Sequence, residues 1–277
     1  MHLIVGAKGL LGCAITQHLG LCGAPMVLAG RSAQAGEWQL DLAADPAEWQ
    51  VPAGLSAAYL CAAETRLQVC EAEPERTACV NVERTLELAR RLVEAGAFVV
   101  FPSTNLVFDG HRPVFLEGHS VCPVTEYARQ KVRVEAGLRQ WPSRTAIVRL
   151  SKVVHPGMPL LRGWADLLRR GETVRAFANL HFSPITPAYV AEALYAIASR
   201  RLSGITHLSG SGQMSYADLA FALARRLGVR DSLVIPAETP DGPARSSVLD
   251  AGRAARELGV RLPEIAQIVG ELLDSLV

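Results

Sequence analysis

The hydrophobic positions in the first half of this chain follow two alternating periods. Short apolar runs, typical of buried strands, occupy residues 2–6, 25–30, 57–62, 97–101 and 145–150. Apolar residues at helical spacing lie between these runs, over residues 10–20, 78–95 and 124–138. Strands that alternate with helices pair in parallel through right-handed crossovers. The pattern therefore predicts a doubly wound parallel α/β sheet.

The pattern becomes less regular after residue 150. Helical spacing recurs at residues 160–171, 186–201, 215–228, 249–258 and 262–276, and one short strand is predicted at residues 204–210. No linker rich in proline, glycine or serine separates the two halves. We therefore predict one domain that holds the sheet, residues 1–150 plus about 183–210. A smaller, interleaved C-terminal lobe is predicted over about 151–182 and 211–277.

Three glycines connect the first predicted strand to the first predicted helix at a spacing of three and three. In such a loop, Gly6 permits a tight turn, Gly9 lets the backbone approach a pyrophosphate, and Gly12 lets the helix pack closely on the strand. The amides of the helix N-terminus then bind phosphate. The loop predicts a Rossmann-type NAD(P)-binding domain, although a glycine-rich connection without a ligand is the alternative. The predicted cofactor contacts here are Gly6, Lys8, Gly9, Leu10, Leu11 and Gly12.

The end of the second predicted strand indicates which dinucleotide is bound. Sites that prefer NAD place an acid there to hold the ribose 2′-hydroxyl, whereas arginine accommodates the 2′-phosphate of NADP. Here Arg31 and Ser32 follow Ala29-Gly30, and no acid is present at this point. NADP(H) is therefore the predicted cofactor, with NAD(H) as a permitted second one. A solvated surface arginine is the alternative interpretation of Arg31.

Tyr127 and Lys131 form the rarest pattern in the chain. Residues four apart lie on the same face of a helix, and the sequence contains only three lysines. An ammonium beside a phenol favours the phenolate, so we expect Lys131 to lower the pKa of Tyr127. Such a tyrosine can protonate a carbonyl oxygen while hydride arrives at the carbon. A surface tyrosine beside a solvated lysine is the alternative.

Hydroxyl and amide side chains follow the strand at residues 97–101. Ser103, Thr104 and Asn105 are predicted at the carboxyl edge of the sheet, where ligands bind in open α/β folds. A hydroxyl at this place can donate to the same substrate oxygen that Tyr127 protonates. We therefore predict Ser103, Thr104, Asn105 and Tyr127 as substrate-binding residues. Ordinary turn capping by Ser and Thr is the alternative.

Charge and composition exclude several classes of function. The chain has 28 basic and 27 acidic residues, so its net charge of +1 gives no electrostatic support for binding nucleic acid or an anionic membrane. No run approaches 18 apolar residues, and the first residues lack the pattern of a signal peptide. A cytoplasmic protein is therefore expected, and a homodimer is its expected assembly because twofold dimers are the commonest oligomers.

The cysteines and histidines do not predict a metal site. The six cysteines form no C-x-x-C pair, and no histidine lies at zinc-ligand spacing from them. We therefore expect no metal, and we assign no histidine to catalysis.

Taken together, these motifs resemble the extended short-chain dehydrogenase/reductase superfamily, and within it the dTDP-4-dehydrorhamnose reductase family. The string Ser-Thr-x-x-Val-Phe-Asp-Gly is the most specific of them. The matching segments are Gly6-x-x-Gly9-x-x-Gly12, Leu40-Asp41-Leu42, Cys61-Ala62-Ala63-Glu64-Thr65, Val80-Asn81-Val82-Glu83-Arg84-Thr85, Ser103-Thr104-Asn105-Leu106-Val107-Phe108-Asp109-Gly110, Tyr127-x-x-x-Lys131, Val148-Arg149-Leu150-Ser151, Ser183-Pro184-Ile185-Thr186 and Ser247-Val248-Leu249-Asp250.

The resemblance implies a role for each matching residue. Thr104 would be the catalytic hydroxyl, Tyr127 the general acid, and Lys131 the residue that holds the nicotinamide ribose. Besides Arg31 and Ser32, which are predicted above, the implied cofactor contacts outside the glycine loop are Asp41, Leu42, Cys61, Ala62, Ala63, Tyr127 and Lys131. Two residues depart from the family pattern: Asn105 stands where Asp is usual, and Glu64 stands where an aromatic or neutral polar residue is commoner.

Three functions agree with this pattern. The first is an NADPH-dependent reductase that acts on the keto group of a nucleotide-activated sugar or a similar carbonyl compound. The second is a sugar-nucleotide epimerase or dehydratase of the same superfamily. Dehydratases typically follow the catalytic Thr with an Asp-Glu pair, and this chain has Asn105-Leu106 there. The third is a non-catalytic, NADP-binding regulatory subunit that retains the fold.

Overall fold

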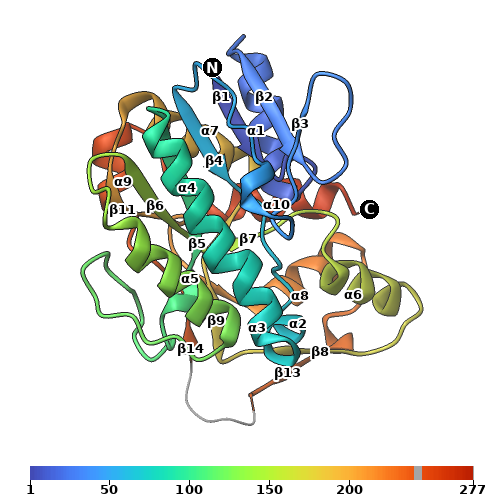
Figure 1. The fold of residues 1–277 in the computed structure, drawn as a ribbon. Coiled ribbons are helices and arrows are strands. Elements are labelled where there is room, and N and C mark those ends of the chain that lie inside the picture. Colours follow the sequence, from blue (N-terminus) through green and yellow to red (C-terminus); the bar gives the residue numbers. More distant parts are fainter. Residues whose placement is uncertain (240–244, 277) are drawn as a thin grey trace.

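Seven parallel strands form the central sheet of the computed structural model, which describes residues 1–239 and 245–276 (Figure 1). Their order across the sheet is β11-β6-β5-β4-β1-β2-β3. The strands are β1 (His2–Val5), β2 (Met26–Gly30), β3 (Trp38–Gln39), β4 (Ala57–Leu60), β5 (Phe98–Thr104), β6 (Thr145–Leu150) and β11 (Gly204–Leu208). The order reverses between β1 and β4, as in a doubly wound Rossmann-type fold. The predicted fold class is therefore confirmed.

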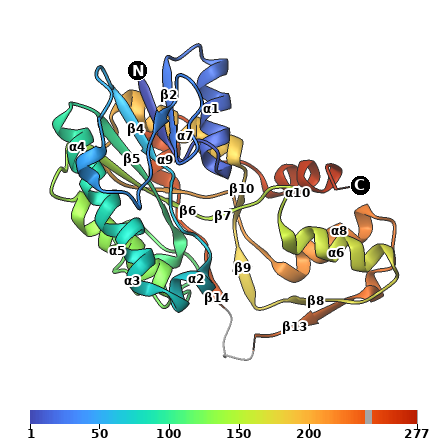
Figure 2. The same ribbon diagram turned by 45° about the vertical axis from the view of Figure 1, so that its right-hand side comes forward.

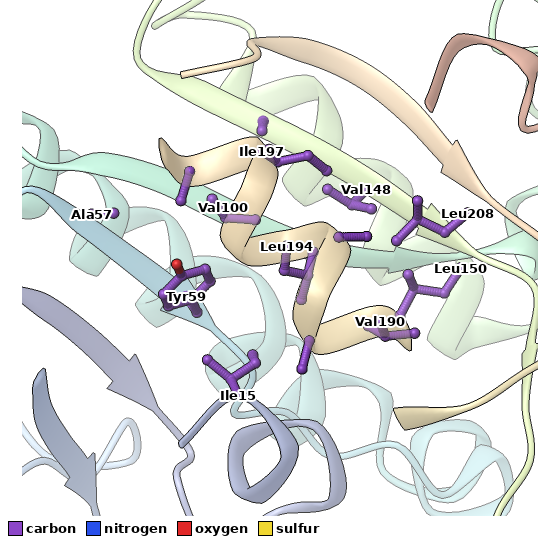
Figure 3. Close-up of a cluster of buried hydrophobic side chains, with 14 of the residues drawn as sticks. Ile15, Ala57, Tyr59, Val100, Val148, Leu150, Val190, Leu194, Ile197 and Leu208 are labelled. Atoms are coloured by element: carbon purple, nitrogen blue, oxygen red, sulfur yellow. The ribbon is translucent and has the colours of Figure 1, made fainter. Parts of the chain in front are cut away.

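Successive side chains of a strand point to opposite faces, and each face of the sheet carries its own core. Ile4 of β1 packs on the side of α1 (Leu10–Leu21), α7 (Pro187–Arg200) and α9 (Gly252–Leu258). Figure 3 shows side chains of α7 in this core, among residues of β4, β5 and β6. Leu3 of β1 packs on the opposite side, with α4 (Thr85–Glu94) and α5 (Glu126–Leu138).

A third core lies beside the sheet rather than on it. It joins α6 (Pro159–Arg169), α8 (Tyr216–Arg226) and α10 (Ile265–Asp274) with the parallel strand pair β8 (Val174–Phe177) and β13 (Val234–Ala237). Figure 2 shows α6, α8, β8 and β13 set apart from the main sheet. The division of the chain into a cofactor domain and a substrate lobe stays a prediction.

The helix α9 does not follow the predicted division. It lies within the stretch 211–277 that we assigned to the smaller lobe, but its Ala254 and Leu258 are buried in the core of the sheet. It packs against α7 and β11. The C-terminal part of the chain therefore contributes to one core of the sheet and to the core beside the sheet.

Several short elements have no counterpart among the predicted ones. Strands of two or three residues leave no periodicity in the sequence. Besides β3 of the central sheet, they are β7 (Lys152–Val153), β9 (Leu180–Phe182), β10 (Pro184–Ile185), β12 (Met214–Ser215) and β14 (Arg245–Ser246). The short helices are α2 (Leu67–Ala72), α3 (Pro74–Ala78) and the 3-10 turns Pro46–Glu48, Asn105–Val107 and Asp231–Leu233. Over the described residues, no helix has the length and apolar character needed to cross a bilayer.

Candidate active site

The glycine loop has the backbone geometry that its spacing predicts. Gly6 has φ +81°, and a Cβ atom there would lie 2.7 Å from the backbone nitrogen of Ala62. A Cβ atom on Gly12 would lie 2.2 Å from the Gly6 carbonyl oxygen. Any larger residue at either position would collide with backbone, so the tight turn and the close packing of α1 on β1 both require glycine.

A groove of about 480 Å³ opens beside this loop, at the carboxyl ends of β1, β2 and β4. In open α/β sheets, ligands bind where the strand order reverses, and the groove lies at that reversal. Its volume falls in the usual range of about 300–1,000 Å³ for ligand sites. The predicted cofactor residues on its wall are Gly6, Lys8, Gly9, Arg31, Ser32, Asp41, Leu42, Cys61, Ala62 and Ala63. The residues Leu10, Leu11, Gly12, Tyr127 and Lys131 were also predicted as cofactor contacts but do not belong to this wall.

Arg31 follows the last residue of β2 and lies on the groove wall with an exposed side chain. We expect Arg31→Ala to weaken NADPH binding by about 1.5–3 kcal/mol, the usual contribution of a charged hydrogen bond. NADH has no 2′-phosphate, so its affinity should stay nearly unchanged. Titration of the purified variant with both nucleotides measures this difference. Equal losses for the two nucleotides would contradict the role of Arg31.

The helix α5 brings Tyr127 and Lys131 to the carboxyl end of β5. Thr125 caps this helix, and its hydroxyl accepts a hydrogen bond of 3.3 Å from the Ala128 amide. The Lys131 Nζ atom donates to the Pro102 carbonyl over 2.9 Å and lies 5.8 Å from the centroid of the Tyr127 ring. Thr104 ends β5 two residues after Pro102. The three residues predicted to be catalytic therefore belong to one region of the sheet edge.

Burial controls the protonation of both helix residues. The pKa of the Tyr127 phenol is raised, chiefly because burial disfavours the phenolate. The predicted lowering of this pKa is therefore wrong for this arrangement, where burial decides the direction of the shift. Burial also lowers the pKa of Lys131 to about 8. Tyr127 consequently holds its proton at neutral pH, which is the form that a general acid requires.

The lowered pKa of Lys131 predicts a pH dependence of cofactor binding. Below about pH 8 the residue is an ammonium, which attracts the anionic dinucleotide, and above it the charge is lost. We expect NADH affinity to fall roughly fivefold to tenfold between about pH 7 and about pH 9.5, because a hydrogen bond to a charged group is the stronger one. Equilibrium titration with NADH at constant ionic strength measures the affinity at each pH. In Lys131→Met the affinity should be lower and independent of pH, and an unchanged pH profile in that variant would refute the assignment.

Cys61 connects the groove to Lys131. It lies on the groove wall directly after β4, and its thiol interacts electrostatically with the Lys131 ammonium. Burial raises the pKa of the Cys61 thiol to about 12, so the thiol stays neutral. The buried Lys131 thus lies next to Cys61, beside the wall of the groove.

Ser103 and Thr104 point into different surroundings. The Ser103 hydroxyl donates to the buried carboxylate of Glu135 over 2.6 Å, so its only hydrogen atom is used within the protein, and the contact between Ser103 and substrate stays a prediction. The strand β5 extends to Thr104 instead of ending at Phe101, so Ser103 and Thr104 point to opposite faces of the sheet. The Thr104 hydroxyl caps the turn Asn105–Val107 by accepting from the Leu106 amide over 3.2 Å.

Asn105 joins the sheet edge to the C-terminal part of the chain. Its side-chain oxygen accepts a hydrogen bond of 3.2 Å from Thr104, and its Nδ2 donates to the Ser247 carbonyl over 3.2 Å. Ser247 follows directly after β14. The residue that departs from the family pattern therefore places an amide, rather than a carboxylate, beside the predicted catalytic hydroxyl.

Asn81 is a structural residue of the site whose contacts the sequence does not reveal. It lies in a π-helical turn, Cys79–Arg84, within the stretch predicted as one continuous helix. Its side chain accepts from the Glu64 amide over 2.8 Å and donates to the Glu64 carbonyl over 2.9 Å. It also donates to the side chain of Gln130, on α5, over 2.7 Å. Asn81 thereby ties the segment after β4 to the helix that carries Tyr127.

Glu64 is the second departure from the family pattern, and it lies on the groove wall. Its carboxylate pairs with the Arg66 guanidinium at 2.6 Å. Hydrogen bonds from Arg66 lower the pKa of Glu64 to about 2. Glu64 is therefore ionised at neutral pH, and its charge on the groove wall is paired with that of Arg66.

A comparison with protein families matches the model described as "RmlD substrate binding domain" over residues 1–277. The chain belongs to this family. The predicted resemblance to the extended short-chain dehydrogenase/reductases, and to dTDP-4-dehydrorhamnose reductases among them, is thereby confirmed.

Relatives of this RmlD-family chain are named for different functions. A dTDP-4-dehydrorhamnose reductase of Sinorhizobium fredii is 28% identical over 232 residues, which cover 78% of this chain and 78% of the relative. Methionine adenosyltransferase 2 subunit beta of Bos taurus is 26% identical over 280 residues, 91% of this chain and 80% of that protein. The crystal structure of dTDP-4-dehydrorhamnose reductase from Bacillus anthracis in complex with NADP superposes with a TM-score of 0.83. It is 20% identical and covers 99% of this chain and 97% of that chain, a likeness that establishes the shared fold.

Proposed function

We propose that this RmlD-family protein is an NADPH-dependent reductase of a keto group on a nucleotide-activated sugar. The observation that carries the proposal is the contact between Lys131, the Pro102 carbonyl and the ring of Tyr127, near the groove of about 480 Å³ at the glycine loop. This arrangement combines a protonated phenol with a buried cation at the carboxyl edge of the sheet. Further support comes from the Sinorhizobium fredii relative, which is named as a reductase of this kind, and from the NADP complex of the Bacillus anthracis structure.

The groove fits a dinucleotide on the chemistry of its wall. Gly6 and Gly9 bring backbone close to the floor, and the first turn of α1 supplies free amides for a pyrophosphate. Arg31 and Ser32 would hold the adenosine end. NADPH, when bound, supplies hydride to the substrate carbon.

Two side chains of the protein would then donate hydrogen bonds to the carbonyl oxygen of the substrate, and a third would hold the cofactor. Tyr127 donates its proton to that oxygen, because its raised pKa keeps the phenol protonated until charge develops on the substrate. The Thr104 hydroxyl donates a second hydrogen bond to the same oxygen and releases its present acceptor, Asn105. Lys131 would hold the nicotinamide ribose through its ammonium, next to Cys61 of the groove wall.

The same geometry weakens the dehydratase alternative. Elimination of water needs a second acid–base pair next to the catalytic hydroxyl. The positions after Thr104 hold an amide and an apolar side chain, Asn105 and Leu106, and neither can transfer a proton at neutral pH. An NADP-binding subunit without catalysis is the other candidate, and the match to the Bos taurus subunit favours it.

A substrate panel separates these functions. Purified protein is incubated with NADPH and a set of keto-sugar nucleotides, and both NADPH absorbance and the sugar products are followed. Oxidation of NADPH together with a reduced sugar is the expected result. An isomerised or dehydrated sugar without net NADPH oxidation would identify an epimerase or dehydratase. Tight binding of NADPH with no turnover of any sugar would favour the subunit.

A further inference from the structure

The connection between β2 and β3 forms the outer wall of the groove, where the adenosine ribose of a dinucleotide is expected. Gln39, in β3, fixes this connection from both sides. Its Nε2 donates to the Arg31 carbonyl over 2.6 Å, and its Oε1 accepts from the Ala33 amide over 3.1 Å. These two hydrogen bonds hold the backbone of the connection in place, and with it the side chains that the connection carries.

Glu37 lies at the end of this connection and contributes an acid to the groove that the end of β2 lacks. Its side chain is only 17% exposed. The Oε2 atom accepts from the Gln34 amide over 2.8 Å and lies 3.7 Å from the Lys8 Nζ atom. Among the described residues both contacts use Oε2, which leaves Oε1 able to accept a hydrogen bond from a ligand.

Lys8 approaches the same place from the glycine loop. It is the residue between Ala7 and Gly9, and its Nζ donates to the Ser32 carbonyl. Its side chain is 57% exposed, so the ammonium can move at little cost. A carboxylate and two cations, Glu37, Lys8 and Arg31, thus line the same wall of the groove.

We propose that Lys8 and Glu37 form a charge pair that determines which ribose 2′-substituent the groove accepts. With NADH, the Oε1 atom of Glu37 accepts a hydrogen bond from the 2′-hydroxyl, while Lys8 stays with the Oε2 atom. With NADPH, Lys8 moves to the 2′-phosphate and joins Arg31 there. The carboxylate then repels the phosphate, which limits the preference for NADPH. This inference rests on the proposed function only in that a dinucleotide occupies the groove.

Substitution of the two members of the pair should change NADPH affinity in opposite directions. Glu37→Gln removes the repulsion, so NADPH should bind about fivefold tighter, while NADH should bind about twofold to fivefold more weakly because a neutral acceptor is weaker. Lys8→Met should weaken NADPH about tenfold and leave NADH within about twofold. Glu48→Gln is the matched control, since Glu48 is an exposed acid close in sequence that does not line the groove.

The test is equilibrium binding of NADPH and NADH to the purified full chain, measured by calorimetry or by nucleotide fluorescence without any substrate. The expected result is a rise in the NADPH-to-NADH affinity ratio in Glu37→Gln of about tenfold or more, with no change in Glu48→Gln. An unchanged ratio in Glu37→Gln, with wild type still binding both nucleotides, would overturn the charge pair alone. A wild-type chain that binds neither nucleotide would overturn the proposed function and the charge pair together.

Discussion

Tyr127→Phe should reduce turnover by roughly 10²- to 10⁴-fold while cofactor affinity survives. The substitution keeps the ring, whose centroid lies 5.8 Å from the Lys131 Nζ atom, and removes only the phenolic proton. A positioned general acid accelerates proton transfer by about this factor. Because burial raises the pKa of Tyr127, the wild-type residue is fully protonated at neutral pH, so the whole acid contribution is lost in the variant.

The decisive measurement is single-turnover oxidation of NADPH with saturating cofactor and a sugar substrate identified from the panel. Tyr216→Phe is the control, because it removes a phenolic hydroxyl from α8, in the core beside the sheet. That variant should react at nearly the wild-type rate. A Tyr127→Phe rate within a factor of about three of wild type would show that another group supplies the proton.

Arg149→Met should lower the free energy of unfolding by about 3–5 kcal/mol, the cost of leaving a buried charge without its partner. The side chains of Arg149 and Glu135 are 1% and 2% exposed, and the closest nitrogen and oxygen lie 2.7 Å apart. Glu135 also accepts the Ser103 hydrogen bond. This group of three connects α5 to β5 and β6, so its loss should also loosen the helix that carries Tyr127 and Lys131.

Denaturant unfolding of wild type and variants tests this expectation. The surface pair Arg225–Asp231 is the control, with side chains 70% and 45% exposed, and Arg225→Met should change stability by less than about 1 kcal/mol. The double variant Glu135→Gln, Arg149→Met removes both charges and should recover part of the loss. A loss below about 1 kcal/mol for Arg149→Met alone would contradict the importance of the buried pair.

The sheet could be predicted from the sequence because each strand leaves a strong local signal. Both faces of β4 and β6 are covered by helices, so every residue of these strands is buried, and the runs are apolar except for Thr145 and Arg149 of β6. The glycine loop could also be predicted from the sequence. A side chain at Gly12 would collide with the nearby residues Gly6 and Ala7, and one at Gly6 would collide with Ala62, just after the adjacent strand β4. Local chemistry was sufficient for these features.

Residues that act across long sequence separations could not be predicted in this way. The hydrogen bond from Ser103 to Glu135 joins residues 32 positions apart, and nothing in the local sequence indicates it. The position of Glu37 in the groove could not be predicted, because Glu37 follows β2 by several residues and reaches the groove only through the folded β2–β3 connection. The expected pKa of Tyr127 was wrong for a similar reason, since the extent of burial is a tertiary property.

The order of strands has a consequence for how the protein can be made. The strand β11 pairs with β6 at one edge of the sheet, yet residues 151–203 come between them in the chain. During translation, at about 5–20 residues per second, the unpaired edge of β6 therefore waits several seconds for its neighbour. An open strand edge is a template for aggregation. A fragment that ends near residue 150 would keep this edge permanently open, so expression of the glycine-loop half alone should give insoluble material.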